Sequence, residues 1–131
     1  MPRALPREVL VVEDHPIVRM VAADTLIQCG IIAWEASDAD EALLVLEEHP
    51  LIGLVFTDVD LPGKSDGLRL AHELSALRPD VSLVVTSGAS AIPDEQLPDR
   101  AAFLAKPYCA GRLVNLVAQK LDRPTTEPVP S

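Results

Sequence analysis

Five short apolar segments constrain the fold of this chain more than any other feature. They are rich in Val, Ile and Leu and too short for helices, and they cover residues 8–12, 31–35, 51–57, 81–86 and 102–105. Runs of this length and composition are typical of strands buried on both faces of a sheet. Helical patterns lie between them, so strand and helix alternate. The alternation predicts an α/β fold with a doubly wound, five-stranded parallel sheet.

The helical segments have recognisable ends. Pro16 suits a first helical turn, and side chains typical of a helix face recur every three or four residues from there to Gly30 (Ile17, Met20, Val21, Thr25 and Leu26). A second helix is expected over 38–48, capped by Ser37 or Asp38 with Glu41 nearby. Two more are expected over 68–77 and 109–121.

The fourth crossover has a weaker helical pattern than the others. Residues 90–100 contain Pro93 and Pro98, which exclude a long regular helix. We therefore expect a short or irregular fourth helix, next to a face of the sheet that another protein could contact.

Composition narrows the function classes. The 131 residues suit one domain, with residues 1–7 as an extension, 8–121 as the domain and 122–131 as a disordered tail. A net charge of −9 argues against nucleic acid as a partner. The two cysteines lack metal-ligand spacing, and no segment resembles a signal peptide or reaches about 18 uninterrupted apolar residues. A cytoplasmic protein without membrane contact is expected.

Polar residues that could bind a ligand or react follow four of the five strands. They are the acidic pair Glu13-Asp14, then Asp58, then the hydroxyl pair Thr86-Ser87, and finally Lys106-Pro107. The carboxyl ends of parallel strands meet at one edge of the sheet, where ligands bind in α/β folds. One acidic pocket is therefore predicted. The alternative is that these are ordinary turn formers, with Asp14 or His15 capping the helix that begins at Pro16.

In this order and strand context, the motif set resembles that of response-regulator receiver domains of two-component signalling. The resemblance covers residues 8–121 and implies a flavodoxin-like fold. It identifies Asp58 as the phosphoacceptor, Ser87, or alternatively Thr86, as the switch hydroxyl, and Phe103 as the switch aromatic. The loop from Asp58 to Gly67 is one residue longer than usual, and Phe103 lacks the hydroxyl of a tyrosine.

The crowded carboxylates predict a hard divalent cation, Mg²⁺ with Mn²⁺ as a substitute. Asp14 and Asp58 would bind it directly, Glu13 through water and Asp60 through its backbone carbonyl. Lys106 would pair with the phosphoryl group, which Ser87 would hydrogen-bond. As in the family, Pro107 is expected to follow a cis peptide bond.

The resemblance implies a stand-alone phosphoacceptor without enzymatic turnover. Its partners would be a histidine kinase or histidine phosphotransfer protein and a downstream protein. A weak homodimer is a further alternative. Asp58-Val59-Asp60 also resembles the nucleophile motif of haloacid-dehalogenase-type phosphatases, but it follows the third strand rather than an early one. A phosphate sink or a pseudo-receiver that acts only as an interaction module is the other alternative.

Overall fold

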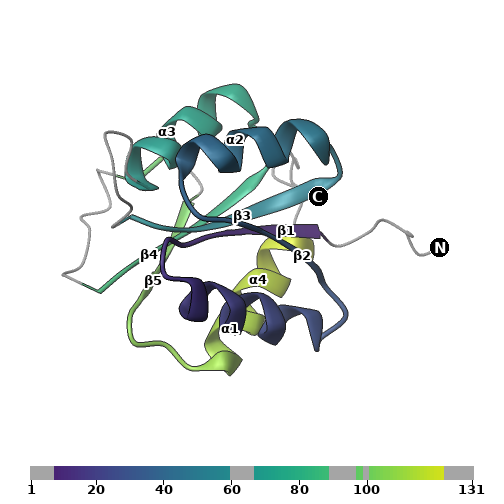
Figure 1. Ribbon diagram of the computed structural model, residues 1–131, viewed down its shortest axis with the longest axis vertical. Helices are drawn as coiled ribbons and strands as arrows, with labels where there is room; N and C mark the ends of the chain where they lie inside the picture. Colours follow the sequence, from purple (N-terminus) through teal and green to yellow (C-terminus); the bar gives the residue numbers. More distant parts are fainter. Residues whose placement is uncertain (1–7, 60–66, 89–96, 99–100, 123–131) are drawn as a thin grey trace, which may run out of the picture.

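The computed structural model describes residues 8–59, 67–88, 97–98 and 101–122. Strands and helices alternate through most of these ranges. They are β1 (Glu8–Val12), α1 (Pro16–Ile27), β2 (Ile32–Ala36), α2 (Ala39–Glu48), β3 (Ile52–Asp58), α3 (Gly67–Leu77), β4 (Ser82–Ser87), β5 (Ala101–Ala105) and α4 (Ala110–Asp122). All strand pairs are parallel, in the order β2-β1-β3-β4-β5. Helices α2 and α3 cover one face, and α1 and α4 the other (Figure 1). The predicted fold class is confirmed.

The sheet separates two apolar cores because successive strand residues point to opposite faces. On one face, Leu10 and Val55 of the central strands pack in one cluster with Leu74 of α3. On the other, Phe56 lies in a cluster with Leu26 of α1. Aliphatic side chains fill both cores, as expected from a sequence with only 3 % aromatic residues.

The expectation that every strand is buried on both faces is wrong for β2 and β5. Ile32 and Glu35 of β2 are exposed, and Ala101 to Phe103 of β5 are half-buried. The strand order explains this, because β2 and β5 are the two edge strands and each has only one neighbouring strand.

Helix α1 ends earlier and faces differently than its pattern predicts. It stops at Ile27, and Gly30 adopts a φ of 86° in the turn that leads to β2. The small residues Ala22 and Ala23 are buried with Leu26, whereas Ile17, Met20 and Val21 are more than half exposed. Small side chains let α1 lie close to the sheet, and the larger apolar side chains remain outside.

The helix caps resolve two open alternatives. His15 is the N-cap of α1, since its Nδ1 accepts from the amide of Val18 at 3.4 Å. Asp38, rather than Ser37, is the N-cap of α2, and its side chain accepts from the amide of Glu41 at 2.8 Å. The carboxylate of Glu41 in turn accepts from the amide and the hydroxyl of Ser37.

Several expectations fall outside the described residues. They are the backbone role of Asp60, the short fourth helix and its proline-broken segment (apart from residues 97–98), the extension at 1–7, and the tail beyond Asp122. Within the described ranges, no helix is both long and apolar enough to cross a membrane.

Candidate functional site

The four sequence-predicted strand ends meet at the carboxyl edge of the sheet. Main-chain hydrogen bonds continue the strand pairing just past the strand ends. The amide of Glu13 donates to Ala36 at 3.0 Å, and the amide of Lys106 donates to Ser87 at 3.1 Å. Between them, the residue after Asp58 donates its amide to Thr86 at 2.9 Å. These bonds hold the site residues on ordered backbone.

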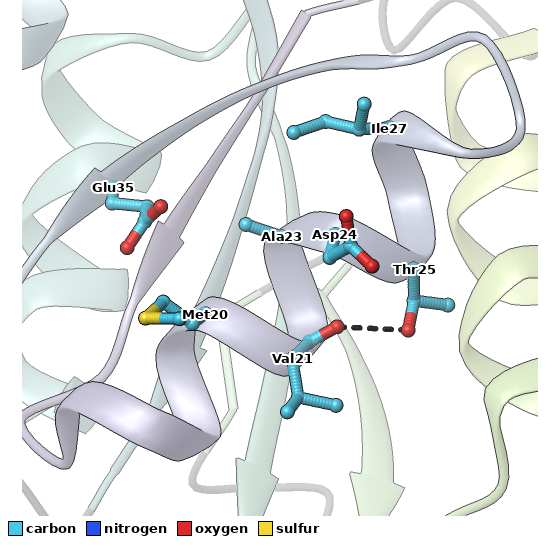
Figure 2. Close-up of a pocket in the computed structure, with 7 residues that line it drawn as sticks. All are labelled: Met20, Val21, Ala23, Asp24, Thr25, Ile27 and Glu35. Atoms are coloured by element: carbon cyan, nitrogen blue, oxygen red, sulfur yellow. Dashed lines mark hydrogen bonds between the residues drawn. The ribbon is translucent and has the colours of Figure 1, made fainter.

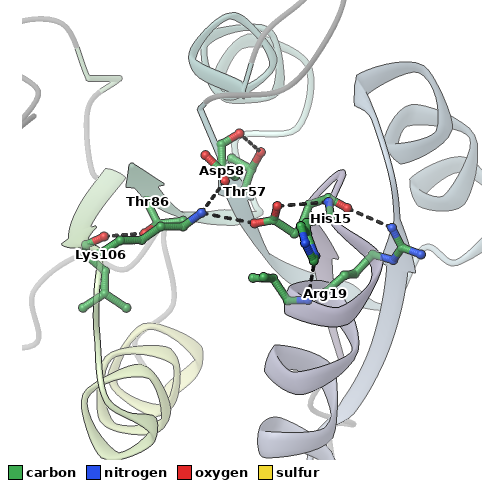
Figure 3. A network of polar contacts seen from close by, with 9 residues as sticks. His15, Arg19, Thr57, Asp58, Thr86 and Lys106 are labelled. Atoms are coloured by element: carbon green, nitrogen blue, oxygen red, sulfur yellow. Dashed lines mark hydrogen bonds and ion pairs between the residues drawn. The ribbon is translucent and has the colours of Figure 1, made fainter. Parts of the chain in front are cut away.

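One ammonium group joins two buried carboxylates in this site. The Nζ of Lys106 donates to Oδ2 of Asp58 at 2.5 Å and to Oε1 of Glu13 at 3.4 Å (Figure 3). Asp58 is only 3 % exposed and Glu13 6 %, although both are acidic. Buried carboxylates are costly unless they are paired or hydrogen-bonded, so Lys106 offsets part of the cost of bringing them together.

The electrostatics of the three groups are linked. Burial raises the pKa of the Glu13 carboxyl; the His15 amide opposes this rise, Asp58 adds to it, and Lys106 again opposes it. Burial works against the charged form of Lys106, but the hydrogen bonds and charges of Asp58 and Glu13 outweigh it, so the pKa of Lys106 is raised. Lys106 is therefore a cation at neutral pH, in a site that carries excess negative charge.

The loop after β1 is bound to its surroundings at several atoms. The amide of His15 donates to Oε2 of Glu13 at 3.2 Å, which turns that carboxylate toward the site. Arg19, one turn into α1, donates through Nη1 to the carbonyl oxygen of Glu13 at 2.9 Å (Figure 3). Asp14, the second member of the acidic pair, is exposed in this loop.

The two candidate hydroxyl residues point to opposite faces of the sheet. Thr86 follows the alternation of Val84, and its Oγ1 donates to the carbonyl oxygen of Leu104 at 2.6 Å in a buried position. Ser87 follows the alternation of Val85, whose partner in β5 is Phe103. Ser87 and Phe103 therefore share a face, whereas the Thr86 hydroxyl bonds the backbone of the edge strand.

The remaining predicted residues lie on β5 and just after it. Phe103 is half-buried and packs against the core cluster on the α2 and α3 side. The Lys106-Pro107 peptide bond is cis. Gly88 lies against the lysine stem, since a Cβ added there would be 3.6 Å from Cδ of Lys106.

The site residues carry the type of ligand atom that a hard divalent cation prefers. Carboxylate oxygens are the preferred ligands of Mg²⁺, and Asp58 and Glu13 place two carboxylates around a single ammonium. Asp14 directly follows Glu13 in the chain. In the part of the chain that the structure describes, no three acidic, His or Cys side chains form a metal-binding group. The donor set thus fits the ion chemically, with Lys106 between the two carboxylates.

Comparison with known proteins identifies the family. The sequence profile described as "Response regulator receiver domain" matches residues 9–118. The chain belongs to the response regulator receiver family. The receiver domain of NtrX from Brucella abortus is 32 % identical with a TM-score of 0.78, and the match covers 87 % of this chain and 98 % of that one. The receiver domain of the hybrid histidine kinase CckA is 33 % identical with a TM-score of 0.74 over 87 % of this chain and 98 % of that chain.

A curated relative is longer than this receiver chain. The transcriptional regulatory protein PdtaR of Mycobacterium tuberculosis is 32 % identical over 123 residues, which cover 92 % of this chain and 59 % of that protein. This chain therefore spans about three fifths of the length of that relative.

Sequence reasoning missed two features beside the receiver site. Arg19 is one of them, and it gave no signal because it lies outside the acidic, hydroxyl and lysine motifs. The other feature is the exposed apolar face of α1, formed by Ile17, Val18, Met20 and Val21. The helical pattern included Ile17, Met20 and Val21 but did not indicate that they would be exposed. A hollow of about 250 Å³ lies between this face and α4, and another of about 380 Å³ lies between α1 and Glu35 of β2 (Figure 2).

Proposed function

We propose that this receiver domain accepts a phosphoryl group on Asp58 from a histidine kinase or a histidine phosphotransfer protein. The reaction depends on Mg²⁺, which Mn²⁺ can replace, and the phosphorylated form signals to a protein partner by a conformational switch. The observation that supports this most is the buried Asp58 carboxylate at the end of β3, hydrogen-bonded to Lys106 beside Glu13.

The acidic residues have two roles at the site, nucleophilic attack and metal binding. A carboxylate oxygen of Asp58 attacks the donated phosphorus, and the bond from phosphorus to the donor's histidine nitrogen breaks. Asp58 and Asp14 would hold Mg²⁺ directly, Glu13 through water, and Asp60 through its carbonyl. When bound, the ion neutralises charge on the phosphoryl oxygens.

Lys106 and Ser87 detect the new charge. The ammonium already donates to Asp58, so it can pair with a phosphoryl oxygen with little movement. The Ser87 hydroxyl would donate to another phosphoryl oxygen and draw β4 toward the site. Phe103 shares the face of Ser87 and would repack in response. Thr86 is the weaker candidate because its hydroxyl bonds Leu104.

The exposed face of α1 is the surface on which we expect the donor protein to dock. Helix α1 starts directly after the acidic loop, so a protein that reaches Asp58 passes over its first turns. Ile17, Met20 and Val21 are 55–60 % exposed there and offer apolar contact. Apolar surface of this kind on a soluble domain is typical of protein interaction sites.

The alternatives differ in stoichiometry. The family match favours a phosphoacceptor over a haloacid-dehalogenase-type phosphatase, and the paired Asp58 and Lys106 favour it over a pseudo-receiver. A phosphoacceptor takes up about one phosphoryl group and loses it slowly, whereas a phosphatase releases many equivalents of phosphate. We do not expect turnover.

Phosphotransfer profiling tests the proposal. The purified protein is mixed with each radiolabelled histidine kinase of the source organism, with Mg²⁺ or with EDTA. We expect rapid, Mg²⁺-dependent labelling by one or a few kinases, at no more than one acid-labile phosphate per chain. Labelling that persists in EDTA would refute the metal role, and absence of labelling by every kinase and by acetyl phosphate would refute the phosphoacceptor function.

A further inference from the structure

Arg19 connects three elements around the acidic loop. Its side chain leaves α1 and is only 20 % exposed. Nε donates to Oε1 of Glu35 on the edge strand β2 at 3.0 Å, and Nη1 donates to the carbonyl oxygen of Glu13 at 2.9 Å. The planar guanidinium group thus serves two acceptors at once, which a lysine ammonium does less well.

These contacts determine the orientation of the peptide that joins the two acidic residues. The backbone of Glu13 is bonded at both ends, by its amide to Ala36 and by its carbonyl to Arg19. Since a peptide unit is planar, holding the carbonyl of Glu13 also orients the amide of Asp14. The direction in which the Asp14 side chain leaves the backbone therefore depends on Arg19.

Arg19 and Lys106 are both cations near the site, but they contact different groups. Lys106 donates to carboxylate oxygens of Asp58 and Glu13, the atoms that a metal ion would use. Arg19 donates to a main-chain oxygen of Glu13 and to Glu35. Lys106 thus competes with a metal for its ligands, whereas Arg19 leaves those oxygens available.

We propose that Arg19 is a positioning residue that holds the Glu13-Asp14 pair in the orientation a divalent cation requires, with Glu35 fixing its guanidinium group. The inference rests on the proposed function, since it concerns the metal used in accepting the phosphoryl group. It assigns a role in metal binding to a residue that lies outside the acidic, hydroxyl and lysine motifs.

Whether Arg19→Gln weakens or strengthens metal binding distinguishes a positioning role of Arg19 from a purely electrostatic one. Removing a positive charge beside an acidic site strengthens the attraction of a divalent cation by Coulomb's law. If Arg19 acted only through its charge, Arg19→Gln would bind metal more tightly. If Arg19 positions the loop, the same change weakens binding, because residues that orient metal ligands typically contribute about 10- to 100-fold to affinity.

The experiment measures Mn²⁺ binding to the unphosphorylated protein by electron paramagnetic resonance of free Mn²⁺. The variants are Arg19→Gln and Arg19→Lys. Arg78→Gln is the matched control, since Arg78 forms a two-bond pair with Asp80 just before β4, at the opposite edge of the sheet, and is similarly buried. Acetyl phosphate labelling across a range of Mg²⁺ concentrations gives a second readout.

We expect Arg19→Gln to raise the Kd for Mn²⁺ about tenfold and to shift half-saturating Mg²⁺ equally, with the maximal labelling rate nearly preserved. Arg19→Lys keeps the charge but loses the planar guanidinium group that serves two acceptors, so we expect the Kd for Mn²⁺ to rise about threefold. Arg78→Gln should stay within about twofold of the wild type, because Arg78 and Asp80 lie at the other end of β4 from the site.

Unchanged or tighter Mn²⁺ binding by Arg19→Gln would overturn the inference while leaving the proposed function intact. If that variant does not fold, Arg19→Lys decides: a raised Kd supports positioning, and a wild-type Kd overturns it. Failure of the wild type to bind Mn²⁺ or to be labelled would overturn both proposals.

Discussion

The Nζ of Lys106 lies 2.5 Å from Oδ2 of Asp58, although the two residues are 48 positions apart in the sequence. Lys106 directly follows β5 and Asp58 ends β3, and these two strands do not pair, because β4 lies between them. The side chains meet above the end of β4, where Thr86 and Ser87 lie. We therefore expect a group added to Asp58 to act on β4 and β5 together, and the first three predictions follow from this arrangement.

Asp58→Asn should abolish acid-labile labelling by kinase and by acetyl phosphate, because an amide cannot form the acyl phosphate. Measurement is by radiolabel on denaturing gels with and without acid treatment. Asp80→Asn removes the same charge from an exposed carboxylate and should label normally. Normal labelling of Asp58→Asn would show that another residue is the acceptor.

Lys106→Ala should lower the free energy of unfolding in EDTA, since Asp58 and Glu13 would lose the cation between them. Removing one partner of a buried pair costs several kcal/mol, and with Lys106 27 % exposed we expect about 1–2 kcal/mol. Mg²⁺ should restore more stability to the variant than to the wild type, because its ligands no longer bond the ammonium group. Urea unfolding measures both effects, and equal stability of the two proteins in EDTA would contradict the prediction.

Thr86→Val and Ser87→Ala should have different effects. Thr86→Val removes the buried bond to Leu104 and should cost about 1–2 kcal/mol of stability, with the phosphorylation-linked amide shifts retained. Ser87→Ala should still accept the label but lose the shifts around Phe103. Nuclear magnetic resonance of the phosphorylated proteins distinguishes them. Loss of the shifts in Thr86→Val alone would make Thr86 the switch hydroxyl.

Glu41→Gln should destabilise the protein at neutral pH and progressively less in acid. Hydrogen bonds from the amide and hydroxyl of Ser37 lower the pKa of Glu41. A carboxyl group with a lowered folded-state pKa stabilises the fold above its ordinary pKa, 4.5 here, and loses that effect as the pH falls through the folded value. Urea unfolding at pH 7, 5 and 4 measures the difference. Glu47→Gln, an exposed change near the end of the same helix, should not reproduce it.

Much of the fold follows from local sequence patterns. Apolar runs of strand length alternate with helical spacing, and this alternation requires parallel strands with helices on both faces. Polar residues at the strand ends, including Glu13, Asp58 and Lys106, could be assigned to one edge because parallel strands all end there. The composition of the two aliphatic cores was also visible in the sequence.

Tertiary structure decided what depends on neighbours distant in the chain. The strand order leaves β2 and β5 only partly buried, which a run of apolar residues alone cannot reveal. Close packing of Ala22 and Ala23 on the sheet leaves Met20 and Val21 outside, because burial depends on the surface a helix meets as well as on its periodicity. The contact from Arg19 to the carbonyl of Glu13 could not be predicted from the sequence, since every residue has a carbonyl and only the turn of the loop brings this one within reach.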